Sequence, residues 1–307
     1  MEWLRSAQVF ECVVQSASFS EAGRRLGCSP ATISRHINDL EEHLKVRLVN
    51  RTSRHLSLTE AGEVYSNQLL RILADIRQAN GMVADLHGTP TGLLRVHSRM
   101  VIGHQFIVPI LHRFHARYPQ IQVELELSNY PADLVAKGID IDIRMGRLTD
   151  SSLVVRKLLP SERLLCASPA YLDRAPPITS PEDLRAHSCL NYRIHQAPPM
   201  WRLRTRDGQE TVVPVTGAFH SNSGLALLQA TLDDMGISIM NDWTVRDHLA
   251  QGRLRRVLPG YEVTFSDFEN GIYAVFQRSS GVPSKIRHFL DFLVAEFKAL
   301  KMQAGAE

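Results

Sequence analysis

A helix near residue 30 carries side chains that could hydrogen-bond to the edges of DNA bases. Four apolar residues between Ile33 and Leu44 are spaced 4, 3 and 4 apart and form one buried stripe. Small residues on the opposite face would let the helix enter the major groove, and Arg35 could bond a guanine bidentately. That face and its flanks carry Ala31, Thr32, Ser34, Arg35, His36 and Asn38.

Capping residues predict where this helix and its predecessors begin and end. Residues 18–21 (SFSE) form a capping box, and Gly27 ends the short helix that the box opens. Ser29 caps the next helix, and Pro30 suits its first turn because no amide proton is needed there. Apolar spacing over residues 4–14 predicts a helix before both. The arrangement is that of a helix-turn-helix.

A basic cluster and a strand pattern surround the end of this segment. Between Arg24 and His55 there are seven Lys or Arg and three Asp or Glu, a local excess of 7 − 3 = +4 in a chain whose net charge is +3. The alternation in residues 54–59 (RHLSLT) predicts a β-wing. Clustered positive charge is typical of phosphate contact, so double-stranded DNA is the predicted partner. The alternative is an ordinary solvated face.

A long helix with a heptad seam is predicted over residues 60–88, before the breaker sequence 88–92 (GTPTG). Such a seam has no globular core to bury in, so it predicts a partner helix and a homo-oligomer. The alternative is packing on the chain's own C-terminal domain. The seam consists of Tyr65, Leu69, Ile72, Ile76, Ala79, Val83 and Leu86.

Residues 93–307 alternate strand and helix patterns, which predicts α/β architecture with largely parallel sheets. The predicted strands cover residues 93–97, 121–127, 139–143, 163–167, 212–216, 236–240 and 271–277. The predicted helices cover residues 102–118 (bent near Pro109), 133–137, 181–186, 224–232, 242–251 and 284–301.

Polar residues follow several of these strands, where an open α/β sheet binds its ligand. Helix N-termini near Met100 and Ser223 favour an anion, and Arg144 could bond a carboxylate, so we expect a small organic acid. The alternatives are an ion pair of Arg144 with Asp140 or Asp142, and a mere capping role for the serine. The candidate ligand-binding residues are Ser98, Met100, Asn129, Arg144, Gly146, Ser221, Asn222 and Ser223, with Arg99, Ser128, Met145 and His220 beside them.

Composition and missing motifs exclude several other classes of protein. A chain of 307 residues is too long for one hydrophobic core, so more than one domain is expected. Its content of 44% hydrophobic and 22% charged residues is ordinary for a globular protein. Without a run of about 20 apolar residues or a leader pattern, we expect a cytoplasmic protein with no membrane partner. The sequence shows no GxSxG, P-loop or GxGxxG, so no enzyme and no cofactor are predicted. Thirteen scattered histidines and four separated cysteines predict no metal site, and Cys166 is interpreted as a buried apolar residue.

The stretch SFSEAGRRLGCSPATISRHINDLEEHLKVRLVNRTSRHLSLTEAG resembles the winged helix-turn-helix of LysR-type transcriptional regulators. The family often has Gln after the capping serine, where this chain has Pro30, so a bidentate adenine contact at that position is impossible. The resemblance implies groove-facing positions for Ser29, Ala31, Thr32, Ser34 and Arg35, with Pro30 and His36 beside them, and backbone or wing positions for Arg51 and Arg54.

Strings such as LHRFHARYP, DIDIRMG and DMGISIM resemble the effector-binding module of the same regulators. That module is similar to type 2 periplasmic binding proteins, with two Rossmann-like lobes and two crossovers, placed here near residues 160–163 and 266–269. The resemblance implies a winged helix-turn-helix at 1–59, a linker helix for dimerisation at 60–88 and an effector domain at 89–307. Lobe I would comprise about 89–161 and 268–307, and lobe II about 162–267.

Residues and resemblance together predict a ligand-responsive transcription factor that binds a partly palindromic site as a dimer or a dimer of dimers. RNA polymerase is a further candidate partner. The rival hypotheses are a solute-binding protein and an enzyme on the α/β scaffold with an accessory DNA-binding module. The N-terminal domain and the missing leader argue against the first, and the lack of a nucleophile–base pair argues against the second.

Overall fold

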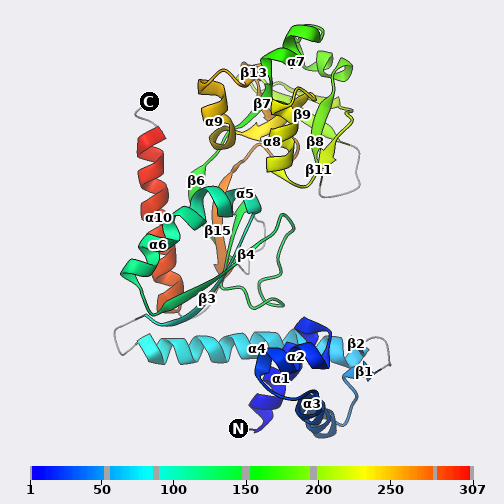
Figure 1. The fold of residues 1–307 in the computed structure, drawn as a ribbon, viewed down its shortest axis with the longest axis vertical. Coiled ribbons are helices and arrows are strands. Elements are labelled where there is room, and N and C mark those ends of the chain that lie inside the picture. The colour runs from blue at the N-terminus through cyan, green and yellow to red at the C-terminus, as the bar shows by residue number, and fades with distance from the viewer. Residues whose placement is uncertain are drawn as a thin grey trace. The chain divides into compact units, whose positions relative to one another are not determined.

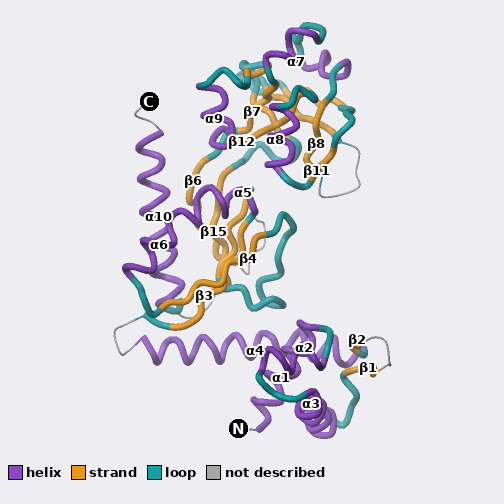
Figure 2. Tube along the Cα trace, in the orientation of Figure 1, coloured by secondary structure: helices purple, strands orange, loops and turns teal. Residues whose placement is uncertain are grey.

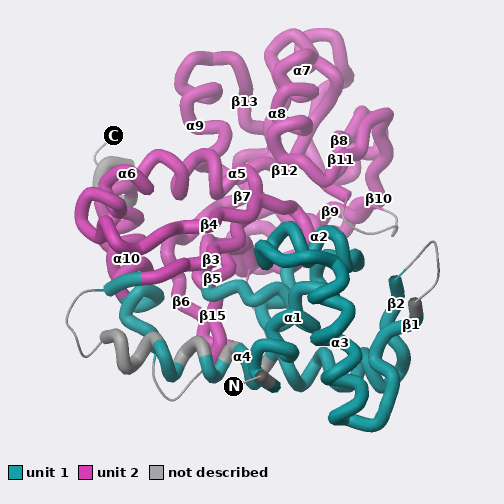
Figure 3. Tube along the Cα trace, turned by 60° about the horizontal axis from the view of Figure 1, so that its bottom comes forward, with its two compact units in different colours: residues 1–91, 132–140, 279–287 teal, residues 92–131, 141–278, 288–307 magenta. Residues whose placement is uncertain are grey.

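The computed structural model describes residues 2–51, 56–85, 90–146, 153–193, 199–278 and 282–304 (Figure 1). The chain divides into two units (Figure 3). Unit 1 comprises residues 1–91, 132–140 and 279–287, and unit 2 comprises residues 92–131, 141–278 and 288–307. No helix in the described ranges is long and apolar enough to cross a membrane.

Three helices open unit 1 and share one apolar core. They are α1 (Glu2–Ser16), α2 (Phe19–Leu26) and α3 (Pro30–Leu44). The Oγ of Ser18 accepts a hydrogen bond from the amide of Glu21, and Gly27 takes a left-handed φ of 65° at the end of α2. The predicted beginning and end of α2 are therefore confirmed. The core includes Ala7, Phe10, Ile33, Ile37, Leu40 and Leu48, each at most 1% exposed.

The predicted wing is a short antiparallel hairpin. Strand β1 (Val49–Arg51) pairs with β2 (Leu56–Leu58), and Val49 lies opposite Leu58. Residues 52–55, with Arg54 among them, lie outside the described residues. The side chain of Arg51 also lies outside them, so the predicted phosphate contacts of both arginines stay predictions.

The long helix α4 (Glu60–Asp85) has two uses for its apolar residues. Tyr65 and Leu69, which begin the heptad seam, pack with Leu73 into the core of the helix-turn-helix. The prediction that this seam lacks a globular core is therefore wrong for its first turns. Farther along, Ile72 is 45% exposed. Leu86 and the side chain of Val83 lie outside the described residues.

The first five-stranded sheet of unit 2 has the order β4-β3-β5-β15-β6. β3 is parallel to both of its neighbours, whereas β15 is antiparallel to β5 and to β6. Against this sheet, the ring of Phe114 from α6 lies 4.9 Å from that of Phe289 in α10. The elements are β3 (Gly92–Ser98), α6 (Val108–Arg117), β4 (Ile121–Leu127), β5 (Ile141–Met145), β6 (Leu153–Pro160), β15 (Gly271–Gln277) and α10 (Ser284–Ala304).

The second five-stranded sheet has the order β11-β8-β12-β7-β13, and a smaller antiparallel sheet has the order β10-β9-β14 (Figure 2). Trp201 of β9, 2% exposed, packs with Leu165 and Ile237 into one core. The elements are β7 (Arg163–Ala167), α7 (Pro169–Arg174), β8 (Cys189–Tyr192), β9 (Met200–Arg204), β10 (Glu210–Pro214), β11 (His220–Ser221), α8 (Gly224–Leu232), β12 (Ile237–Asn241), α9 (Asp242–Ala250), β13 (Arg255–Val257) and β14 (Glu262–Thr264), with a 3-10 helix at Pro181–Ala186.

Both large sheets are mixed, which corrects the prediction of largely parallel sheets. The chain leaves the first sheet after β6, builds the second from β7 onward, and returns to the first in β15. Strand β15 therefore runs antiparallel to β5, because it enters the sheet from the opposite end. The passages at residues 161–162 and 265–270 lie where the crossovers were expected.

Two predicted helices differ from the structure. Residues 100–117 form α5 (Met100–Ile102), a π-helical turn (Gly103–Ile107) and α6 rather than one bent helix. The amide of Val108 bonds to Gly103, just before Pro109, which has no amide proton to continue the regular ladder. Residues 134–138 form turns, because the carboxylate of Asp133 accepts from the amides two and three residues later.

Gly62 tests how closely the wing and α4 approach each other. A Cβ at this position would lie 2.0 Å from the carbonyl oxygen of Leu48, just before β1. Because that oxygen accepts the amide of Thr59, neither backbone can shift freely. We expect Gly62→Ala to lower stability by about 1–3 kcal/mol, measured by urea unfolding followed by circular dichroism. Gly260→Ala, with open space around it, is the control; equal stability of the two variants would contradict the prediction.

Candidate DNA interface and ligand pocket

The recognition helix α3 turns one face to its own core and leaves the other open. Ile33 and Ile37 are fully buried, whereas Ala31, Thr32 and Arg35 are exposed. At its start, the Oγ of Ser29 accepts the amide of Thr32 at 3.1 Å and Pro30 is the first helical residue. These caps were predicted from the sequence, and they leave the first turn of α3 ordered and exposed.

Two predicted DNA-contacting residues lie on the flank of α3 rather than on its open face. The Nδ1 of His36 lies 3.1 Å from the Oγ of Ser6, which is 5% exposed on α1. Ser34 is half-buried. The structure thus gives His36 a role in packing α3 against α1, while DNA contact by either residue stays a prediction.

Glu41 connects the recognition helix to the wing by hydrogen bonds. From the sequence, this residue is only one of three negative charges in the segment, and its role is not predicted. Its Oε1 accepts the amides of Leu48 at 2.7 Å and of Val49 at 3.1 Å. Both amides are at the start of the wing, where a charged acceptor makes a strong hydrogen bond. One carboxylate therefore sets the position of β1 relative to α3.

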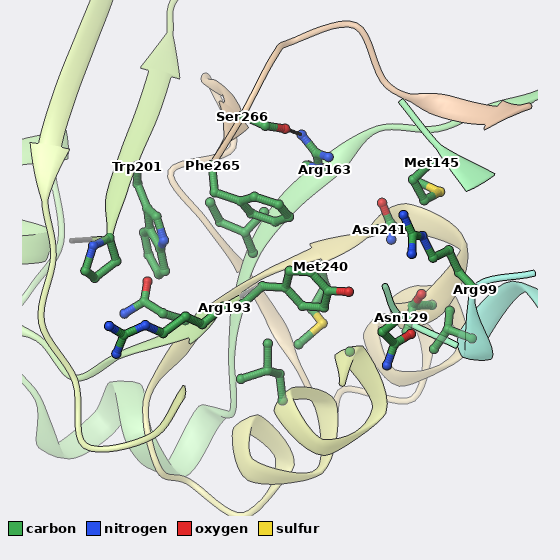
Figure 4. A pocket seen from close by; sticks show the side chains of 18 of the residues that line it. Arg99, Asn129, Met145, Arg163, Arg193, Trp201, Met240, Asn241, Phe265 and Ser266 are labelled. Carbon is green, nitrogen blue, oxygen red and sulfur yellow. Dashed lines mark hydrogen bonds between the residues drawn. The ribbon is translucent and has the colours of Figure 1, made fainter. Parts of the chain in front are cut away.

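Unit 2 contains a cavity of about 480 Å³ whose walls come from both large sheets and the helices beside them (Figure 4). Arg99, Asn129 and Met145 come from the part of unit 2 that holds the first sheet. Most of the other lining residues come from the part that holds the second sheet. The lining is Arg99, Val101, Ile102, Asn129, Met145, Arg163, Asn191, Tyr192, Arg193, Pro199, Met200, Trp201, His220, Gly224, Leu227, Ile239, Met240, Asn241, Trp243, Thr244, Phe265 and Ser266.

One of the eight candidate ligand-binding residues lines this cavity. Asn129 does so, and its Oδ1 accepts the amide of Met100 at 3.4 Å. Ser223 caps α8 with its Oγ, Ser221 accepts the amide of Ser223, and Ser98 is fully buried. Ligand contact by those outside the lining stays a prediction; they are Ser98, Met100, Arg144, Gly146, Ser221, Asn222 and Ser223.

A buried charged cluster lies where Arg144 was expected to meet a ligand. The carboxylate of Asp142, 1% exposed, is 2.7 Å from the Nδ1 of His97 and 2.5 Å from the Nη2 of Arg144. The ion pair considered as an alternative for Arg144 is thus present. Arg99 extends this cluster to the cavity, and burial lowers the pKa of its guanidinium, partly offset by the charge of Asp142.

The far wall of the cavity is aromatic, and most of it was missed from sequence. The rings of Tyr192 and Phe265 stack with centroids 5.6 Å apart, and the guanidinium of Arg163 lies 4.4 Å from the centroid of Phe265. Burial lowers the pKa of Arg163 to about 10. Tyr192 is the last residue of β8, and a ligand of an open α/β sheet binds at such strand ends. The sequence pattern does not predict β8, so this position is missed. Trp201 is placed by pairing of β9 with the neighbouring strand β10 and with the distant strand β14.

Thiols and metal-binding groups give no further site among the described residues. In those ranges no three His, Cys, Asp or Glu residues gather as a metal site would require. Cys166 and Cys189 are buried, and burial raises the pKa of each thiol to about 12. Both are therefore protonated at neutral pH and make weak nucleophiles.

The bond between Glu41 and the wing can be tested separately from DNA chemistry. Glu41→Ala leaves the amides of Leu48 and Val49 without their acceptor, so we expect a loss of about 1–3 kcal/mol in the free energy of unfolding. Urea unfolding measures it. Glu42→Ala, at the exposed neighbouring position, removes the same charge without this contact. Equal losses in both variants would show that net charge, not the hydrogen bonds, carries the effect.

Comparison with known proteins assigns both parts of the chain. Residues 4–63 match the bacterial regulatory helix-turn-helix protein model of the lysR family, and residues 87–298 match the LysR substrate binding domain. The chain is 34% identical to the HTH-type transcriptional regulator DmlR of Escherichia coli K12, over 94% of this chain and 93% of the relative. It is 35% identical to the HTH-type transcriptional regulator CrgA of Neisseria meningitidis serogroup C, over 94% of this chain and 95% of that relative.

Solved structures agree with this assignment. The full-length virulence activator AphB of Vibrio cholerae matches with a TM-score of 0.64 and 29% identity, over 95% of this chain and 98% of that one. CrgA of Neisseria meningitidis matches with a TM-score of 0.59 and 33% identity over the same shares. The chain therefore belongs to the LysR family and is a ligand-responsive, DNA-binding transcriptional regulator.

Proposed function

We propose that this regulator binds a partly palindromic promoter site as a homodimer, in the cytoplasm, and that a small organic acid in the cavity of unit 2 alters its action. The exposed first turns of α3 carry the DNA part of the proposal. Arg35 projects from the face opposite the buried Ile33 and Ile37, with Ala31 and Thr32 beside it. A guanidinium flanked by small side chains can reach a guanine edge in the major groove. Contact with RNA polymerase stays a prediction.

The homodimer is supported by apolar side chains that α4 leaves exposed. Ile72 is 45% exposed and Val64 is 64% exposed, on a helix that buries Leu69 and Leu73 in the core of unit 1. Ile76 and Ala79 follow Ile72 at heptad spacing, with Ile76 half-buried and Ala79 exposed. A second copy of α4 would cover this stripe. Two recognition helices related by a dyad would then fit two half-sites.

The cavity supports the effector part of the proposal. Its walls come from two sheets, and the chain passes between these sheets at residues 161–162 and 265–270. A ligand that contacts both walls can favour one relative arrangement of the sheets, by no more than its difference in affinity for the two arrangements. The arginines in the lining favour an anion.

Arg35→Ala tests the recognition helix. Loss of a bidentate base contact should weaken binding to the promoter upstream of the protein's own gene by about 1–3 kcal/mol and relax base preference. Binding is measured by fluorescence anisotropy against scrambled DNA over a range of salt. Arg206→Ala, which removes an exposed arginine of unit 2, is the control. Unchanged affinity of Arg35→Ala for both DNAs would refute the assignment.

Ile72→Glu tests the dimer. A carboxylate placed in the apolar stripe of α4 would be buried without a partner, so we expect dissociation to monomers at micromolar protein, seen by sedimentation velocity. Asn67→Glu introduces the same charge at an exposed polar position of α4, away from Ile72 around the helix, and should leave the oligomer intact. A wild-type monomer, or an Ile72→Glu dimer of wild-type stability, contradicts this interface.

A further inference from the structure

We propose that the cavity of unit 2 takes an aromatic monocarboxylate whose ring carries a hydrogen-bond donor, such as a phenolic hydroxyl. This deepens, and rests on, the proposed role of the cavity as the effector site. Three features of the lining carry it: an arginine with a buried nitrogen that lacks an acceptor among the described residues, an aromatic wall and a buried amide oxygen that receives no hydrogen bond from those residues.

The first feature is centred on Arg99. Asp142 is the one carboxylate acting on this guanidinium among the described residues, and it already pairs with Arg144 and His97. The Nη1 of Arg99 is buried and has no hydrogen-bond acceptor among the described residues. The described lining of the cavity contains no Asp or Glu. A buried cation without its own counter-ion is unfavourable, and a ligand carboxylate would supply both the charge and the acceptor.

The other two arginines of the lining, Arg163 and Arg193, indicate how many carboxylates the ligand carries. The Nη1 of Arg163 donates to Thr264, to Ser266 at 3.0 Å and to the carbonyl of Asp267 at 3.2 Å, so it is held by the protein. Arg193 is exposed, at the border of the described residues. Among the described lining residues, only Arg99 has a buried guanidinium nitrogen without an acceptor, which favours a monocarboxylate over a dicarboxylate.

The aromatic wall defines the body of the ligand. Trp201 lies at the opposite end of the cavity from Arg99 and Asn129, and Phe265 lies between them (Figure 4). The stacked pair of Tyr192 and Phe265 offers flat surfaces, which favour offset or edge contacts with another ring. A molecule with its carboxylate at Arg99 would place its apolar body against this wall. A volume of about 480 Å³ is ample for a single substituted ring.

The ring substituent follows from Asn191. This side chain is 2% exposed and lines the cavity. Its Nδ2 donates to the carbonyl of Cys189 at 2.8 Å, which fixes the orientation of the amide, and its Oδ1 receives no hydrogen bond from the described residues. A buried acceptor left unsatisfied is costly, so a ligand that brings a donor gains affinity over one that does not.

The test is isothermal titration of the full-length protein with a matched panel of acids. The panel contains 4-hydroxybenzoate, 4-hydroxyphenylacetate and 3-(4-hydroxyphenyl)propanoate, each with its parent lacking the hydroxyl and with its neutral amide, and succinate. We expect at least one hydroxyaryl acid to bind about tenfold tighter than its parent, a difference of about 1.4 kcal/mol, and tighter still than its amide and succinate. Tightest binding of succinate, equal binding of acid and amide, or no binding by any member would overturn the proposal.

Two variants locate the contacts. Arg99→Gln should abolish the preference for acid over amide without lowering the melting temperature of the free protein, because it removes a cation that has no carboxylate of its own among the described residues. Asn191→Leu should make the hydroxyaryl acid and its parent bind equally. Arg206→Gln, outside the lining, should leave both preferences unchanged. A wild-type preference for the acid in Arg99→Gln, or for the hydroxyl in Asn191→Leu, overturns the corresponding contact.

The same preparations separate this inference from the proposed function. Specific promoter binding by wild-type protein, together with failure of the whole acid panel, would leave the DNA-binding proposal standing and overturn the ligand class. Selective binding of a hydroxyaryl acid without specific promoter binding would support the ligand class and overturn the DNA-binding proposal.

Discussion

Burial of the Asp142 carboxylate constrains the first sheet of unit 2 and the cavity beside it. Asp142 of β5 lies opposite His97 of β3 in the parallel ladder, so their side chains share one face of the sheet. Asp142 also pairs with the guanidinium of Arg144, and removing one partner from such a buried ion pair costs about 3–5 kcal/mol because the other charge is left uncompensated. The sheet therefore keeps its acid and its two basic neighbours together. Arg99, one residue beyond β3, lies at the end of this chain of charges, where the protein supplies no second acid among the described residues.

The N-terminal unit solves a different problem, which is to order a helix while leaving half of it in solvent. The apolar stripe of α3 anchors it, Ser29 satisfies an amide at its start, and Glu41 attaches the wing to its last turns. The apolar stripe and Glu41 lie away from the exposed face, and Ser29 uses only its exposed start. Side chains there are free to be selected for DNA, which explains why Pro30 can replace the family's glutamine without harming the fold.

Local signals were predictable from sequence, and long-range placement was not. The caps at Ser18 and Ser29 each accept the amide of a residue three positions later, so their bonds follow from spacing alone. The places of Asn191 and Trp201 in the cavity depend on long-range strand pairing, of β8 with β12 and of β9 with β14, and the sequence patterns do not predict β8 or β9. Arg144 and Arg99 illustrate the limit: both follow or end a strand of the first sheet, and the buried position of Asp142 decides which of them reaches the cavity.

Trp243 is the residue through which a ligand in the cavity can reach the connection between the two sheets. It lines the cavity, and its Nε1 donates to the Oγ of Ser161 at 2.9 Å, in the passage between β6 and β7.

The same tryptophan also contacts the π-helical turn that precedes α6. Its carbonyl accepts from Gln105 at 3.1 Å, and its ring meets Phe106 edge-on at 5.0 Å. A π-helical turn has a less regular hydrogen-bond ladder than an α-helix and is often found at functional sites. Trp243 therefore contacts the cavity, the passage between β6 and β7, and the π-helical turn before α6.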